Sequence, residues 1–520
     1  MKNIRFLFSI IMVMATFTAC DDGILNLKNP NAYDTGTFFT NPVELQQATN
    51  AIYSGLYFSG LYSREYYFIF DLAGNDAAPD TPLEAELAEF ALFTYNGSNE
   101  YLELYWRSLY RIILRANLAV DKSKDYLDSS KGTEEERALV TRCIAEAKFL
   151  KAWAYFELVT SFGRVPVKKT FAELEINHTP RSEVSEIWAY IEELLKEAIP
   201  DLPESYTKPD YGRATSGAAN ALLGKSYLYQ AKYTEAISAF EKVSGELLPF
   251  DKYHWNFSDQ DEEENNVESI FQVQIKYIPG SRVWGYGNVE QGEPAGTCHT
   301  ARSMEYGFND WANVYVSQGV ASQFRYKDNQ GNMIDDPRGP QTFYGTTNYA
   351  VGKMIYLDFT DNPKPYDNSL GLRFRKYQNY ERIEFEKQPQ SSNNINIIRY
   401  ADVLLMHAEA LIMNGNVSEG MDVLNRVRER AGVFKWEGIS DKNTAMEKVK
   451  HERVLELTGE QVRFKDLIRW GEAKQVLNKE LAIQYGPGTY FQDKHVLLPI
   501  PIEEINTNNA VASDIRDNWN

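Results

Sequence analysis

Residues 221–243 read ALLGKSYLYQAKYTEAISAFEKV, and this stretch decides the fold. Its apolar residues recur three and four positions apart, which is the spacing of one helix face. Leu223-Gly224 is followed by Tyr227, and Ala236 is followed four positions later by Phe240. Small residues let two helices cross closely, while aromatic rings fill the space beside them. The stretch therefore predicts two helices packed against each other as a hairpin.

These residues occupy the offsets of a tetratricopeptide repeat, and Pro249 lies close to the position of its closing proline. A weaker copy of this pattern follows in two predicted helices that meet at Asn414-Gly415. Its equivalent positions are occupied by Ala408, Leu411, Gly420 and Leu424. One such hairpin cannot bury its hydrophobic face alone, so several must stack. The sequence predicts an all-α fold of tetratricopeptide-like helical hairpins.

Helical periodicity continues on both sides of this stretch, and it predicts helices at 43–70, 100–126, 134–161 and 184–198. Residues 250–395 break the pattern, because Gly, Pro, Asn and Asp are frequent and 269–277 alternates like a strand. Irregular runs of this length are usually functional. We therefore expect a single domain at 43–520, with a helical part at 43–249, a loop-rich insertion with short strands at 250–395, and a C-terminal helical part at 396–520.

The beginning of the chain resembles a bacterial lipoprotein signal. Lys2 and Arg5 precede an apolar run at 6–17 that is too short to span a bilayer, and Thr18-Ala19-Cys20 follows. The resemblance implies a signal peptide at 1–19, acylation of Cys20 and a lipidated tether at 20–42. Acyl chains contribute about 0.8 kcal/mol per buried methylene, so they would hold the protein on a membrane. An ordinary signal peptide with an incidental Cys is the alternative.

Charge and motif spacing exclude several classes of function. The 520 residues carry a formal net charge of −19, which repels nucleic acid and anionic lipid. Cys143 and Cys298 permit one disulfide at most, and no metal-ligand spacing is present. No catalytic arrangement emerges from six scattered histidines. We therefore expect neither cofactor nor metal. Carboxylates are plentiful, so counting does not exclude a glycosidase pair, but nothing singles one out, and a surface glycoside hydrolase is disfavoured against a non-catalytic protein.

Three short motifs fail on inspection. Gly224-Lys225-Ser226 lacks the first glycine of a phosphate-binding loop, since that position is Ala219. His451-Glu452 lacks the second histidine of a zinc-protease helix. Residues 328–336 lack the pattern of a calcium loop.

The C-terminal third strongly resembles the SusD/RagB family of outer-membrane nutrient-binding lipoproteins. The resemblance lies in residues 397–405 (IIRYADVLL), 408–410, 424–432 (LNRVRERAG), 452–457, 463–471 (RFKDLIRWG) and 498–505, with earlier blocks at 106–117, 145–166 and 212–214. Its recurring blocks are mainly structural. Arg399, Arg428 and Arg469 lie at helical distances from Asp402, Glu429 and Asp466, and we expect these pairs to tie helices together.

The resemblance implies a SusD-like α-α superhelix on the cell surface, anchored by lipid in the outer membrane. Such proteins sit as a lid over a SusC-like TonB-dependent transporter, and most studied ones bind glycans. One branch of the family serves peptide uptake, so a RagB-like peptide-capturing protein is the alternative.

Sugars have an apolar face and a polar rim, so a surface that recognises them needs exposed rings beside polar groups. The chain has 33 Tyr and nine Trp, although most single rings are expected to pack between helices. In the family, the ligand surface is built from loops of the N-terminal third and the middle insertion. Two stretches here fit, and the candidate ligand-binding residues are Tyr67, Asp76, Tyr95 and Asn96 in the first, with Trp284, Tyr286, Arg302 and Trp311 in the second.

Overall fold

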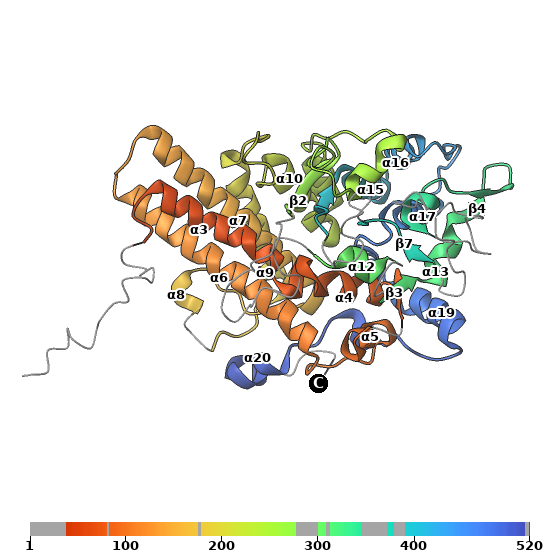
Figure 1. Ribbon diagram of the computed structural model, residues 1–520, viewed down its shortest axis with the longest axis horizontal. Coiled ribbons are helices and arrows are strands. Elements are labelled where there is room, and N and C mark those ends of the chain that lie inside the picture. The colour runs from red at the N-terminus through yellow and green to blue at the C-terminus, as the bar shows by residue number, and fades with distance from the viewer. Residues whose placement is uncertain are drawn as a thin grey trace, which may run out of the picture.

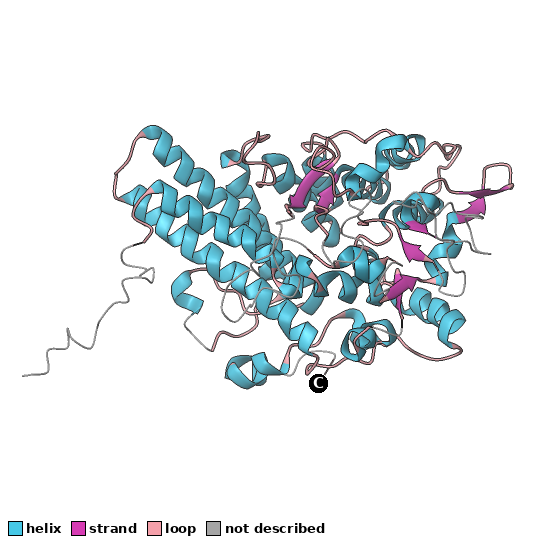
Figure 2. Ribbon diagram, in the orientation of Figure 1, coloured by secondary structure: helices cyan, strands magenta, loops and turns pink. Residues whose placement is uncertain are grey.

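The structure is a computed structural model that describes residues 38–80, 83–174, 178–276, 300–307, 313–344, 372–378, 391–514 and 519. Helices make up most of this part of the chain, and its strands are short (Figure 2). None of the helices within these ranges is long and apolar enough to cross a membrane.

Long helices form one end of the molecule (Figure 1). They are α3 (Pro42–Ser54), α6 (Glu100–Asp128), α7 (Glu134–Phe162) and α9 (Val184–Ala198). Asn99 caps α6, and Thr133 caps α7 with a capping box, in which the Thr133 hydroxyl accepts from the Glu136 backbone N–H and the Glu136 carboxylate accepts from the Thr133 backbone N–H. The three helices predicted from periodicity between residues 100 and 198 are confirmed, with ends within two residues of expectation.

The predicted continuous helix at 43–70 is wrong. After α3 the chain makes a 3₁₀ turn at Gly55–Tyr57 and a π turn at Ser59–Ser63 before α4 (Glu65–Ala73) begins. Leu61 is not helical, with φ −119° and ψ −132°. Gly60 explains the break, because a Cβ there would collide with the backbone carbonyl of Leu104 in α6. Apolar spacing does not reveal such a backbone approach, so the sequence could not show the kink.

The predicted helical hairpins are confirmed. Residues 221–240 lie in α10 (Ser216–Tyr229), α11 (Tyr233–Phe240) and the turn between them. The weaker copy of this pattern around Asn414-Gly415 lies in α15 (Tyr400–Met413) and α16 (Val417–Arg430). A Cβ on Gly224 would lie 2.6 Å from the Phe240 ring, so only glycine lets the ring pack there. Gly420 repeats this arrangement, since its Cβ would lie 2.6 Å from Ile412.

The middle of the chain supplies short strands in four antiparallel pairs within the described residues. The predicted strand at 269–277 is observed as β2 (Ser269–Val273), which pairs with β8 (Ile395–Arg399). The other pairs are β1 (Ala77–Pro79) with β3 (Val314–Val316), β4 (Arg325–Lys327) with β5 (Met333–Asp335), and β6 (Phe343–Tyr344) with β7 (Arg373–Phe374).

Further helices complete the architecture. Those before the C-terminal part are α5 (Ala85–Leu92), α8 (Phe171–Leu174), α12 (Arg302–Tyr306), α13 (Gln318–Ala321) and α14 (Gly339–Thr342), with 3₁₀ turns at Ile199–Asp201, Phe250–Phe257 and Ser322–Phe324. Those of the C-terminal part are α17 (Lys442–Leu457), α18 (Arg463–Arg469), α19 (Ala473–Tyr485), α20 (Ile502–Thr507) and α21 (Asn509–Ala512), with a 3₁₀ turn at Asp493–Val496.

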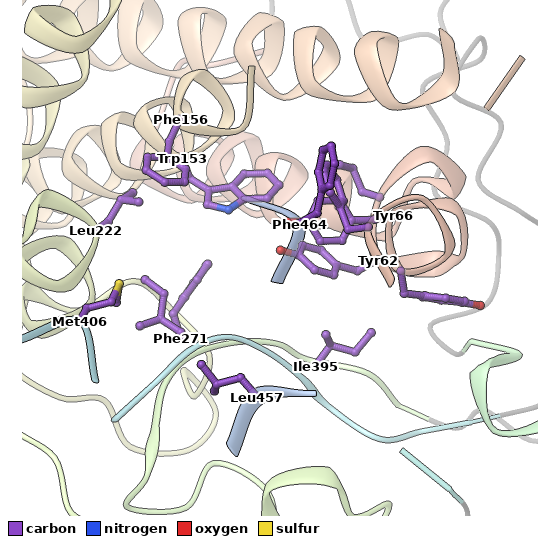
Figure 3. Packing of buried hydrophobic residues seen from close by; sticks show 14 of the residues in the cluster. Tyr62, Tyr66, Trp153, Phe156, Leu222, Phe271, Ile395, Met406, Leu457 and Phe464 are labelled. Carbon is purple, nitrogen blue, oxygen red and sulfur yellow. The ribbon is translucent and has the colours of Figure 1, made fainter. Parts of the chain in front are cut away.

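One large hydrophobic core joins these parts (Figure 3). Trp153 of α7, Leu222 of α10, Phe271 of β2 and Met406 of α15 all belong to it, although they come from distant parts of the sequence. The fold is therefore held by packing between helices and strands of all three sequence regions, as expected for burial of apolar surface.

Charged side chains form a second buried centre, the buried ion network. Arg338 lies 2.7 Å from Glu452 and 3.0 Å from Glu456, and Arg399 lies 2.7 Å from both Glu456 and Glu268. Burial alone would raise the pKa of Glu456, but the guanidinium groups around it hold that pKa well below its usual range. The remaining members are Asp336, Lys376, Arg428, Arg430 and Glu460.

The expected arginine pairs are only partly confirmed. Arg469 does pair with Asp466, at 2.9 Å. The partners predicted for Arg399 and Arg428 are wrong, because Asp402 accepts from Arg453 and Glu429 pairs with Lys435. Helical spacing finds only partners on the same helix. Arg399 ends strand β8 and Arg428 pairs with Glu452 of α17, so tertiary packing sets both contacts.

The buried ion network yields a stability prediction. Glu456→Ala is expected to lower the free energy of unfolding by about 3–5 kcal/mol, because Arg338, Arg399 and Arg430 would stay buried with one partner fewer. Glu447→Ala, on the same helix but with a carboxylate 69% exposed, should cost less than about 1 kcal/mol. Urea unfolding measures both. Equal losses would contradict a special role for the network.

A second prediction concerns Glu65, which is 3% exposed at the start of α4. Burial raises the pKa of Glu65 to about 8, against the opposing charge of Arg64. A pKa raised on folding stabilises the protein fully below the unfolded value, about 4.3, and this stabilisation is lost as the pH rises through about 8. Glu65→Gln keeps a neutral side chain. The stability of the variant relative to the parent should therefore rise between pH 5 and 8, by up to about 1.4 kcal/mol per pH unit. Urea unfolding across this pH range checks it, and a flat difference would refute it.

Candidate functional site

Five of the predicted ligand-binding residues lie in the described part of the chain, and they are Tyr67, Asp76, Tyr95, Asn96 and Arg302. Trp284, Tyr286 and Trp311 lie outside the described residues, as does Cys20, the predicted site of acylation. The roles given to these four residues remain predictions.

The fold brings the two predicted stretches together in what we term the Arg302 cluster, made of Tyr67, Asp71, Arg302, Tyr306 and Tyr377. The Arg302 guanidinium lies 5.0, 5.1 and 3.9 Å from the ring centres of Tyr67, Tyr306 and Tyr377. It also lies 3.6 Å from Asp71, which accepts a hydrogen bond of 2.9 Å from the Tyr306 hydroxyl. A cation among ring faces is strongly attracted where water is excluded. The cluster thus fastens α12 to α4.

The expectation that Tyr67 and Arg302 present exposed groups is wrong, since they are only 1% and 2% exposed. The Tyr67 hydroxyl donates a hydrogen bond to Glu305. Arg64 pairs with Glu305 at 2.5 Å and with Glu84 at 2.9 Å. All of α4 is buried, so its aromatic residues pack on every side instead of forming one exposed face. The cluster therefore holds residues 300–307 against α4.

Of the other predicted residues of the first stretch, Tyr95 and Asn96 are not part of this cluster, whereas Asp76 adjoins it, because its backbone N–H donates to the Asp71 carbonyl at 2.9 Å. Tyr95 is 1% exposed and stacks on Phe90 with ring centres 4.8 Å apart, so it is a core ring and the expectation of an exposed ring is wrong. Asn96 is exposed and accepts hydrogen bonds from Ser98. Asp76 is buried and accepts from the Gly459 backbone at 3.1 Å. Burial raises the pKa of Asp76 to about 8, which the nearby Arg463 charge opposes.

One exposed ring and two half-buried rings lie instead where α19 meets the β1–β3 pair, in a surface that we term the tyrosine patch: Tyr485 is exposed, and Tyr315 and Tyr490 are half-buried. Tyr485 is 38% exposed, and its ring centre lies 6.2 Å from that of Tyr490. The Gln484 amide donates to the hydroxyls of Tyr315, at 3.0 Å, and Tyr485, at 2.8 Å. The three rings thus share one surface with an amide between them.

Strand pairing and ion pairs hold the tyrosine patch in place. Tyr315 lies in the middle of β3, opposite Ala78 of β1. Arg373 lies 5.9 Å from the Tyr315 ring centre, donates to the Val314 carbonyl and pairs with Asp80 at 2.5 Å. Burial raises the pKa of the Tyr315 and Tyr485 hydroxyls, so both are neutral hydrogen-bonding groups at ordinary pH. Ring faces beside amide and guanidinium groups suit a ligand with apolar faces and hydroxyl edges.

Sequence reasoning missed the tyrosine patch, although a signal was present. Tyr485-Gly486-Pro487-Gly488-Thr489-Tyr490 places two rings at the ends of a Gly/Pro turn. Rings beside such turns are less often part of a helix core, and Trp284 likewise lies between Gly280 and Gly285 in the sequence. Tyr315 gives no comparable signal, because its exposure depends on the pairing of β3 with β1.

Comparison with known proteins gives a consistent result. A model of the SusD family matches residues 267–515, and a SusD-like model described as starch-binding associating with outer membrane matches residues 25–228. A SusD-like protein of Bacteroides ovatus is 25% identical over 488 residues, which cover 89% of this chain and 83% of that protein. The starch-binding protein SusD of Bacteroides thetaiotaomicron is 24% identical over 461 residues, covering 78% and 77%. The solved structure of a laminarin-binding SusD-like protein is 25% identical, covers 90% of this chain and 98% of its own, and has a TM-score of 0.70.

The family and the fold expected from the sequence are therefore both confirmed. The matches to the two models extend over helical parts on both sides of the insertion, and the likeness in structure extends over nearly the whole chain. This chain belongs to the SusD family.

Proposed function

We propose that this protein is a non-catalytic, cell-surface glycan-binding lipoprotein that passes oligosaccharide to a TonB-dependent outer-membrane transporter. The tyrosine patch is the observation that carries the proposal, because it combines an exposed ring and two half-buried rings with fixed polar groups. Relatives that are starch-binding or laminarin-binding by name, and the outer-membrane description of one matching model, support the same class.

The patch adjoins a segment that the sequence already singled out. Trp311 lies two residues before Asn313, whose carbonyl accepts a hydrogen bond of 2.8 Å from the Asp80 backbone. Stacking of a sugar on a ring contributes through apolar contact, while a neighbouring amide such as that of Gln484 selects hydroxyl positions. The prediction that Trp311 binds the ligand stays part of this proposal.

A binding role also fits the state of the carboxylate beside the patch. Glycoside hydrolysis uses two carboxyl groups, one of which must carry a proton. Asp80, a carboxylate beside the patch, is tied to Arg373 by a hydrogen bond and an ion pair, so it is engaged within the protein.

The peptide alternative has less support. A deep charged cavity would favour it, and one of 240 Å³ lies between α17, α18 and α19, with Asp76 in its wall. Its charges are paired with each other or with neighbours, since Lys450 pairs with Glu447 and Glu472, and Arg463 with Glu480. A peptide terminus would have to break such pairs.

The anchor belongs to the same proposal. Acylation of Cys20 would place the tether at residues 20–42 between the membrane and the helical body, which begins with α3. One acyl chain binds a membrane reversibly and several hold it almost permanently. The surface location is what would let a bound glycan reach a transporter.

Affinity electrophoresis on a panel of α-glucans, β-glucans, mannans, xylans and pectins tests the function. The parent protein is expected to be retarded by at least one polysaccharide, and Tyr485→Ala should weaken that binding by about three- to tenfold, the loss of an exposed stacking ring. Trp255→Ala, which removes a half-buried ring elsewhere, should leave it unchanged. Retardation by no polysaccharide, with binding to peptides from a tryptic digest, would overturn the glycan class.

Trp284 gives an independent prediction from the sequence. Trp284→Ala should weaken binding to the same polysaccharide by several-fold, since an exposed indole contributes about 1 kcal/mol by stacking. Isothermal titration calorimetry measures the change. Unaltered affinity would remove Trp284 from the site while leaving the rest of the proposal intact.

A further inference from the structure

A groove lies on a different part of the surface, and we term it the Tyr211 groove. It consists of two adjoining hollows of 500 and 290 Å³ that share Tyr211, Gly212, Arg213 and Gln272. The first hollow runs along β2 and the start of α10, and the second reaches the end of α3. Figure 1 shows α10 and β2 away from α19, which carries much of the tyrosine patch.

A buried carboxylate holds the walls of the groove. Glu146 of α7 has a fully buried side chain, and it accepts hydrogen bonds from the hydroxyls of Tyr53, at 2.9 Å, and Tyr206, at 3.3 Å. It also pairs with Arg213 at 2.9 Å. Arg213 donates further to Asp210 at 2.6 Å and to Asn50 at 2.8 Å. Side chains fixed in this way lose little freedom when a ligand arrives.

The backbone at Gly212 forms one side of the groove. Gly212 has a φ of +85°, and a Cβ there would collide with the side chain of Gln274. Gln274 and Asn265 exchange two hydrogen bonds of 2.9 Å, so their amides form a fixed pair beside the loop. The glycine thus brings the loop with Tyr211 directly against these amides.

The chemistry of the groove suits a neutral, hydroxyl-rich ligand. Tyr211 is 41% exposed and is the most exposed aromatic ring among the described residues. The Arg213 charge is balanced by Glu146 and Asp210, so an anion gains little from it. Amide and hydroxyl groups line it as well, from Ser205, Thr215, Ser216, Ser244 and Asn265, together with one exposed charge of each sign, Glu204 and Lys242.

We propose that the Tyr211 groove is a second glycan-contact site, in which a sugar stacks on Tyr211 and its hydroxyls bind the surrounding amide and hydroxyl groups. This inference rests on the proposed function and adds a separate site to it. Two sites on one body let a long polysaccharide bind more tightly than a short oligosaccharide, because the second contact becomes intramolecular.

The test compares three variants with the parent on the same polysaccharide panel. Tyr211→Ala removes the ring, Tyr211→Phe keeps it, and Trp255→Ala is the control ring outside both sites. Tyr211 lies in an exposed loop, and circular dichroism with thermal unfolding confirms that each variant folds. Tyr211→Ala is expected to weaken retention by a polysaccharide that binds the parent by about threefold or more, while Tyr211→Phe stays within about twofold of the parent.

The outcomes separate this inference from the proposed function. If the parent binds a polysaccharide and Tyr211→Ala binds it equally well, the second site is refuted and the function stands. Loss in Tyr211→Ala alongside unchanged binding by Tyr485→Ala supports the groove and removes the tyrosine patch. Binding of tryptic-digest peptides that depends on Tyr211, without glycan binding, would mean that a peptide lies along β2 and would overturn the inference. If the parent protein binds no polysaccharide, both the proposed function and the second site are refuted.

Discussion

A guanidinium group that is buried away from water must stay beside a carboxylate, and this constraint determines how the middle of the chain sits on the C-terminal helices. In the buried ion network, Glu452 and Glu456 of α17 face Arg338 and Glu268 faces Arg399, with all these side chains at most 1% exposed. Separating one charge from its partners would cost several kcal/mol. Arrangements that shift the middle region against α17 are thereby disfavoured, even where apolar contacts alone would tolerate them.

The hydrophobic core and the buried ion network therefore contribute to the fold in different ways. Apolar contacts such as those of Trp153 and Phe271 contribute most of the driving force, but they are non-directional. Charge pairs add little net stability against a well-packed apolar alternative, yet they specify partners. Together they explain how loop-rich segments can be held in one position on a helical scaffold, with the tyrosine patch and the Tyr211 groove at its surface.

The sequence predicted what depends on local pattern. Helices α6, α7 and α9 could be predicted because their apolar spacing and their ends are local features, and the α10–α11 hairpin because Gly224 and Phe240 keep a fixed offset. What failed depends on contacts between distant residues. The kink at Leu61 follows from Gly60 touching α6, and Tyr67 is buried because Arg302, far along the chain, lies over its ring. Residues of the tyrosine patch come from β3, from α19 and from the turn after α19, and no sequence pattern places β3 beside α19.

The Arg302 cluster has a consequence for how relatives of this protein can diverge. It clamps residues 300–307 to α4 through a guanidinium, three rings and a carboxylate, all buried. The clamp is made by side chains of α4, α12 and Tyr377, so exchanges outside these residues leave its charge and ring contacts in place. Relatives can therefore diverge elsewhere in sequence while α12 keeps its position on α4.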